Sequence, residues 1–86
     1  LDGIGGQEAL SITLYPQPAI NELNLSLPIA GNWVVSIYDQ QGRLIEQLNL
    51  ASLQSKINVS HLTSGIYILS AQHENGHISS ERFIKK

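Results

Sequence analysis

Apolar residues recur at every second position through most of this chain, and that spacing limits most strongly how it can fold. Residues 10–14 read "LSITL" and residues 23–27 read "LNLSL". A period of two places alternate side chains on one face of an extended strand, whereas a helix needs apolar residues three or four positions apart. The chain is therefore expected to form half-buried β-strands.

The same pattern predicts seven short strands separated by turn residues. We expect them near residues 10–14, 21–27, 33–39, 43–48, 56–59, 66–72 and 77–84. Residues 49–55 are expected to form a loop. Short strands with regular turn signals and no convincing helix predict an all-β fold, a seven-stranded antiparallel immunoglobulin-like β-sandwich.

Two hairpins have recognisable turn residues. In the stretch "DQQG", Gly42 stands where a type I turn ends in a left-handed bulge residue. The pair Asn75-Gly76 predicts a two-residue turn in which both residues have positive φ, and that turn would place Glu74 opposite His77.

The inward-facing strand positions predict the core. We expect it to contain Leu23, Leu25, Val35, Ile37, Ile57, Val59, Tyr67 and Leu69. Trp33 shares a face with two of these residues, so core packing is favoured over an exposed sugar-stacking platform. In "HLTSGIY", the spacing of Tyr67 from Leu62 is typical of a tyrosine corner, in which the phenol bonds to upstream backbone.

Composition excludes several kinds of chemistry. The 86 residues include no cysteine, which removes disulfides, thiolate nucleophiles and cysteine metal sites. A net charge of −2 argues against nucleic acid as a partner. No stretch has the length of a membrane span or the pattern of a signal peptide. Because the chain starts at Leu1 and has no methionine, we expect it to be a piece of a longer protein.

The sequence contains no catalytic motif or metal motif that we consider convincing. The histidines, His61, His73 and His77, lack zinc-ligand spacing and are expected to be solvated turn residues, although the last two could share a metal across their hairpin. No GxSxG stretch occurs, and the acidic residues are scattered. We therefore expect no catalytic residue, no metal and no cofactor.

The first residues differ from the rest in composition. Residues 1–8 read "LDGIGGQE" and show no periodicity. We expect residues 1–9 to be a flexible linker, open to proteases around Gly3, Gly5 and Gly6, and residues 10–86 to be the folded domain.

Four segments together resemble a known family. "LYPQPAINELNL", "VVSIYDQQGRLI", "INVSHLTSGIYIL" and the ending "ERFIKK" resemble, in order and spacing, the type A C-terminal sorting domain of type IX secretion cargo in Bacteroidetes. The resemblance runs from about Leu14 to Lys86. Gln17 departs from it, because the family usually has Asn between the two prolines, and Asn forms local side-chain turns more readily.

The matching residues are carried over from the family's motifs. Pro16 and Pro18 match the Pro-x-Pro pair, and Lys85 and Lys86 match the basic end. The Tyr-Asp-x-x-Gly-Arg hairpin is matched by Tyr38, Asp39, Gly42 and Arg43. The Leu-x-x-Gly-x-Tyr corner is matched by Leu62, Gly65 and Tyr67. Of these, the resemblance implies a signal role above all for Pro16, Pro18, Gly42, Gly65, Tyr67, Lys85 and Lys86.

The resemblance implies a function without catalysis. The domain would direct a covalently linked upstream cargo through the type IX translocon, and a sortase-like protease would cut it off near the linker. The cargo would cross the periplasm and reach the outer-membrane surface or the medium. Lys85 and Lys86 are expected to be exposed, and the last strand is expected to offer its backbone edge to a partner.

A second class of function stays open from the sequence. The domain could be a passive accessory module, or a carbohydrate-binding module, of a secreted enzyme. Two or three coplanar exposed aromatic rings would favour that alternative. The sequence does not specify an oligomeric state.

Overall fold

The computed structural model describes residues 11–86 and contains the expected seven strands. They are β1 (Thr13–Tyr15), β2 (Glu22–Ser26), β3 (Trp33–Tyr38), β4 (Leu44–Leu50), β5 (Gln54–Asn58), β6 (Gly65–His73) and β7 (Ile78–Lys85). The expected linker, with Gly3, Gly5 and Gly6, lies outside the described residues.

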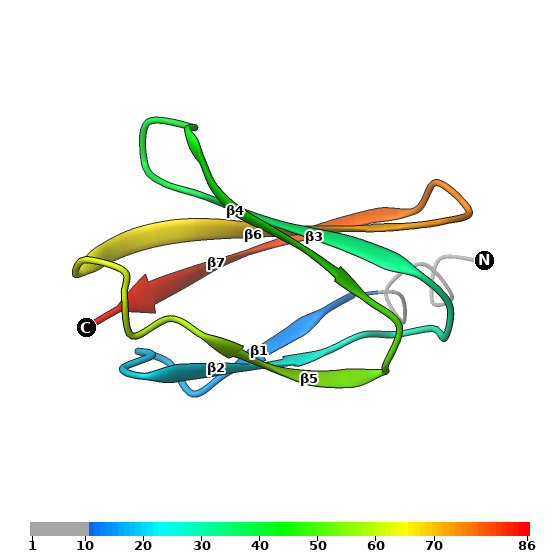
Figure 1. Cartoon of the computed structure of the whole chain (residues 1–86), viewed down its shortest axis with the longest axis horizontal. Coiled ribbons are helices and arrows are strands. Elements are labelled where there is room, and N and C mark those ends of the chain that lie inside the picture. Colours follow the sequence, from blue (N-terminus) through cyan, green and yellow to red (C-terminus); the bar gives the residue numbers. More distant parts are fainter. Residues whose placement is uncertain (1–10) are drawn as a thin grey trace, which may run out of the picture.

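The strands form two antiparallel sheets that pack face to face, as the layers in Figure 1 show. The larger sheet has the order β4-β3-β6-β7, and the smaller sheet has the order β1-β2-β5. The prediction of a seven-stranded antiparallel β-sandwich is confirmed for the described residues. Within residues 11–86 no helix is long and apolar enough to cross a membrane.

The core lies between the two sheets. All eight predicted core residues are buried, and Phe83 and Trp33 are the largest side chains that are almost fully enclosed. Trp33 is 1% exposed, and its Nε1 donates a hydrogen bond to the Ile29 carbonyl at 2.9 Å. Trp33 is therefore a core residue and offers no sugar platform.

One of the two hairpin predictions is confirmed. The Asp39 N–H donates to the Arg43 carbonyl and the Gly42 N–H to the Asp39 carbonyl, both at 3.0 Å. Gly42 has a φ of 83°, a left-handed conformation that glycine adopts without a Cβ penalty. This is the type I turn with a left-handed bulge residue that "DQQG" predicts.

The prediction for the second hairpin is wrong. His73 N–H donates to the His77 carbonyl at 2.7 Å and Gly76 N–H to the His73 carbonyl at 2.8 Å, which is the bonding pattern of the first hairpin. Gly76 has positive φ and Asn75 does not. His77 consequently faces His73 rather than Glu74. The Asn75 side chain accepts the His77 N–H at 2.8 Å and so stabilises the longer turn.

The predicted loop at residues 49–55 is too long. β4 continues to Leu50 and β5 begins at Gln54, so only residues 51–53 connect them. The reason is that Leu48 and Leu50 both pack against the core, so the alternation extends further along β4 than the sequence interpretation allowed.

We expect Leu69→Ala to lower the free energy of unfolding by about 2–5 kcal/mol, because it removes a buried side chain and leaves a cavity. The matched variant Ile68→Ala changes the neighbouring position in β6, which faces outward and is 38% exposed. It should cost about 1 kcal/mol or less, within the range of strand propensities. Urea unfolding measures both, and equal losses would contradict the assignment of faces.

Candidate functional site

The residues that match the four sequence motifs lie together at one end of the sandwich. Lys85 pairs with Gly65 in the larger sheet and forms a parallel bridge with Ala19. Asp39 and Tyr67 line one shallow depression at the same end. Figure 1 shows the turn between β3 and β4, the loop before β6 and the C-terminus on the same side. We call this region the C-terminal end of the sandwich.

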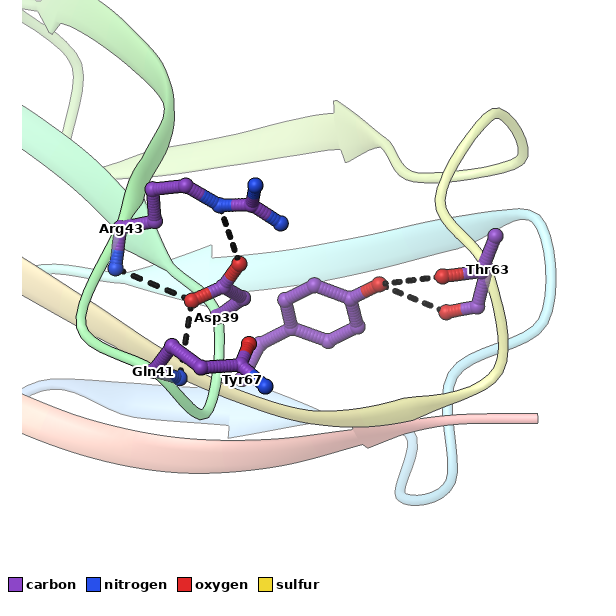
Figure 2. Close-up of polar contacts among 5 residues, drawn as sticks. All are labelled: Asp39, Gln41, Arg43, Thr63 and Tyr67. Carbon is purple, nitrogen blue, oxygen red and sulfur yellow. Dashed lines mark hydrogen bonds and ion pairs between the residues drawn. The ribbon is translucent and has the colours of Figure 1, made fainter.

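The tyrosine corner is present. Tyr67 Oη donates to the Thr63 carbonyl at 2.7 Å, and the Thr63 hydroxyl lies 3.2 Å from the same oxygen (Figure 2). The ring is buried and stacks on Phe83, with a centroid distance of 5.5 Å and an interplanar angle of 19°. These contacts attach the loop before β6 to the last strand. The prediction from "HLTSGIY" is confirmed.

The Asp39 carboxylate organises the first hairpin. Its Oδ1 accepts the N–H groups of Gln41 and Arg43, and its Oδ2 accepts Arg43 Nε, each at 2.9 Å (Figure 2). The bond from the Arg43 N–H is the largest cause that lowers the pKa of Asp39 below its usual value. The Arg43 side chain itself is 77% exposed. The carboxylate therefore fixes the turn and leaves a guanidinium at the surface.

Gln17 attaches the proline segment to the edge of the last strand. Its Nε2 donates to the Arg82 carbonyl and its Oε1 accepts the Ile84 N–H, both at 3.1 Å. Ala19 continues the pairing, since its N–H donates to the Ile84 carbonyl and its carbonyl accepts the Lys86 N–H, both at 2.8 Å. The Gln17 amide thus behaves like a backbone amide of an added strand and makes no local turn.

This pairing corrects the expectation that the last strand has a free backbone edge. The edge of β7 is covered by residues 17–19 from Arg82 to Lys86, so the expected free edge is absent there. Pro16 and Pro18 lie in the connection between β1 and β2, and both follow cis peptide bonds. The segment between them places Gln17 against β7, and the chain then continues into β2.

The two terminal lysines differ in exposure. Lys85 is only 7% exposed, so the expectation that it faces solvent is wrong, whereas Lys86 is exposed. Strand alternation puts Lys85 on the same inward face as Phe83, and its Nζ donates to the Lys86 main-chain oxygen at 3.0 Å. A long aliphatic stem can cover apolar neighbours while its ammonium group reaches a polar atom.

The expectation of solvated histidines is wrong for His73. This side chain is 8% exposed and lies edge-on to Trp33, at a centroid distance of 4.9 Å. Its Nδ1 accepts the Asn75 N–H at 3.1 Å, so its Nε2 is the atom that donates to the Ala30 carbonyl at 2.7 Å. Among residues 11–86, no cluster of three or more His, Cys, Asp or Glu residues could hold a metal.

The described aromatic residues do not form a carbohydrate platform. Trp33 and Tyr67 are buried. Tyr15 is 46% exposed on the outer face of the smaller sheet, and Tyr38 is half-buried on the outer face of the larger sheet. Rings on opposite faces of the sandwich cannot stack on one sugar chain, so the feature that would favour the accessory-module alternative is not found in this part of the chain.

Comparisons with known proteins place this geometry in context. A family model described as "Secretion system C-terminal sorting domain" matches residues 13–86. PorZ, a bacterial surface component of the type-IX secretion system of Porphyromonas gingivalis, has a similar structure, with a TM-score of 0.75 and 22% identity. The match covers 87% of this chain but only 11% of the PorZ chain.

A second solved structure is also similar. It is a DUF3244 family protein with an immunoglobulin-like β-sandwich from Bacteroides vulgatus, with a TM-score of 0.76 and 15% identity over 92% of this chain and 88% of that one. At these identities both likenesses show the fold alone. No curated protein matches the sequence significantly.

We expect Gln17→Ala to expose the Ile84 amide to exchange with solvent, because the variant removes the acceptor of that N–H. The loss in stability should be about 1 kcal/mol, the usual net value of a hydrogen bond. Amide hydrogen exchange measured by NMR tests this residue by residue. Gln40→Ala, in an exposed turn, serves as the control. Unchanged protection of Ile84 in Gln17→Ala would contradict the pairing.

Asp39 should contribute stability that depends on pH. The pKa of Asp39 is lower in the folded protein than in the unfolded chain. Its contribution to the free energy of unfolding is therefore fully present above the unfolded pKa of about 3.9, and it is lost as the pH falls through the folded pKa. Asp39→Asn should therefore melt below the wild type at neutral pH, and the difference should shrink in strong acid. Melting temperatures across this pH range measure it. A difference that stays constant would contradict the assignment.

Proposed function

Because the chain belongs to the secretion system C-terminal sorting domain family, we propose that it is the non-catalytic address domain of a larger exported protein. In this proposal residues 10–86 direct a covalently linked upstream cargo through the type IX translocon. The cargo crosses the periplasm and reaches the outer-membrane surface or the medium. A sortase-like protease removes the domain within the linker of residues 1–9, around Gly3, Gly5 and Gly6.

The family match over residues 13–86 is the observation that carries this proposal. The geometry supports it, because motif residues that are far apart in the sequence meet at the C-terminal end. Tyr67, Gly65 and Lys85 hold that end together. Lys86 and Arg43 present positive charge at its surface. We assign Tyr67, Gly65 and Lys85 to shaping the signal. We assign Lys86 and Arg43 to direct contact with the secretion machinery.

The polar groups at this end also support a role without catalysis. The Asp39 carboxylate is engaged by Arg43 and by turn N–H groups, and the Tyr67 hydroxyl is engaged by Thr63. Each group therefore already has a structural partner. The arrangement resembles the scaffold of a recognition surface more closely than a set of groups that await a substrate.

Export of a reporter tests the proposal. Residues 1–86, joined to the C-terminus of a neutral reporter that carries a periplasmic export signal, should bring the reporter to the surface or medium of a host with a type IX system. The same reporter without the domain should stay in the periplasm. If both reporters, with and without the domain, stay in the periplasm, the sorting function is rejected. Mass measurement of exported reporter that still carries the intact chain would reject the cleavage.

Variants of the two terminal lysines distinguish a role in recognition of the signal from a role in stabilising the fold. Lys86→Ala should reduce export while stability changes by no more than about 0.5 kcal/mol, as is usual for surface substitutions. Lys85→Ala should lower the melting temperature of the isolated chain, because it truncates a buried stem. Normal export by Lys86→Ala would reject the reading role given to that residue.

A further inference from the structure

The outer face of the larger sheet has exposed apolar side chains among polar ones, which are Ser36, Gln47, Asn49, Ser70, Gln72 and Ser80. Strand register places six aliphatic side chains on this outward face, each 38–58% exposed, namely Val34, Leu44, Ile66, Ile68, Ile78 and Ile84. An antiparallel sheet that meets water on one side ordinarily alternates apolar residues inward with polar residues outward. This sheet has apolar residues on both of its faces.

The smaller sheet provides a control within the same molecule. Its outward positions are polar or charged apart from Tyr15, and they include Thr13, Glu22, Asn24, Gln54, Lys56 and Asn58. Both sheets cover the same core and belong to the same small domain. The exposed aliphatic side chains are therefore a property of the larger sheet and do not follow from the composition of the chain.

The apolar residues are densest at the C-terminal end. Tyr38 pairs with Leu44 on one side and Ile68 on the other, and Ile66 pairs with Ile84. We call these five residues the apolar patch. A shallow hollow lies between the patch and the turn after β3, lined by Tyr38, Ile66 and Ile68 of the patch and by Asp39, Gln40 and Gly42 of the turn. The patch thus crosses all strands of the sheet beside the motif residues.

The charge on this face has one sign. Among the described strand residues on the outer face of the larger sheet, Arg82 is the one charged side chain, and it pairs with Ile68 within the patch. Lys86 follows Ile84 two positions further along. The acids of these strands, Glu46 and Glu81, pair with the inward-facing residues Ile37 and Leu69. A partner that covers the patch would have to satisfy a guanidinium group in apolar surroundings.

We propose that the apolar patch and Arg82 form the docking surface for a protein of the secretion machinery, whose own apolar surface places a carboxylate against Arg82. This inference rests on the proposed function. A second copy of the chain fits poorly, because the carboxylate that lines this hollow, Asp39, is already bonded to Arg43 and to the Gln41 N–H. A lipid surface also fits poorly, because interfacial binding relies on Trp or Phe beside several Lys or Arg residues, and Trp33 and Phe83 are both buried.

The test uses variants of the reporter fusion that keep the strand geometry. Ile66→Thr combined with Ile68→Thr retains β-branched side chains while it removes apolar surface. Arg82→Glu reverses the charge and Arg82→Lys keeps it. Lys56→Glu, an exposed charge reversal on the smaller sheet, is the matched control. Thermal unfolding of each purified chain establishes that the variants fold.

We expect the double threonine variant and Arg82→Glu each to reduce export at least about tenfold, the loss expected for truncation or charge reversal at an interface anchor. Arg82→Lys should retain most export, and Lys56→Glu should match the wild type. If the wild type is exported and the two patch variants are exported equally well, the docking surface is rejected while the sorting function stands. If the wild type itself is retained, both proposals fall.

Three further measurements identify the class of partner. Host mutations that restore export of Arg82→Glu should replace an acidic residue with a basic or neutral one in a protein of the secretion machinery, and suppressors without such a change would overturn the charge pairing. Self-association of the purified chain that the threonine variant abolishes, seen by analytical ultracentrifugation, would overturn the proposal in favour of a second copy. Patch-dependent co-sedimentation with phosphatidylethanolamine–phosphatidylglycerol vesicles would overturn it in favour of a membrane surface.

Discussion

Burial of one apolar layer between the two sheets is the interaction on which the rest of this structure depends. The chain has no cysteine, and small domains without disulfides or metals rely on the core that they can pack. Trp33 and Phe83 are the largest residues in that layer and lie far apart in the sequence. Every feature at the C-terminal end is positioned by strands that this layer holds in register.

The last strand is connected to the remainder of the domain on both of its sides. β6 pairs with one edge along most of its length, and residues 17–19 pair with the other edge near its end. Phe83 attaches it to the core and to Tyr67. The terminal segment of the sorting domain is therefore a structural part of the sandwich. A partner has access to its outer side chains, Arg82 and Ile84, rather than to its final backbone edge.

Sequence patterns predicted local features well and long-range pairings poorly. Alternation identified the strands and the buried face, because burial follows the period of two directly. The turn at Gly42 was predicted, whereas the similar turn at Gly76 was not, because an Asn-Gly pair fits more than one hairpin. The bond from Gln17 to β7 and the burial of Lys85 depend on which segments meet across more than 60 positions, and periodicity carries no information about that.

The parallel bridge between Ala19 and Lys85 has a mechanical consequence. Figure 1 shows the described chain starting on the side of the molecule away from its last residue along the long axis. The hydrogen bonds between residues 17–19 and β7 run across that axis. Tension applied between the two ends would pull the paired segments past each other. All of these hydrogen bonds would then bear the load at the same time, instead of breaking one after another. Forced unfolding is governed by the barrier to rupture, and these hydrogen bonds oppose rupture under tension between the two ends.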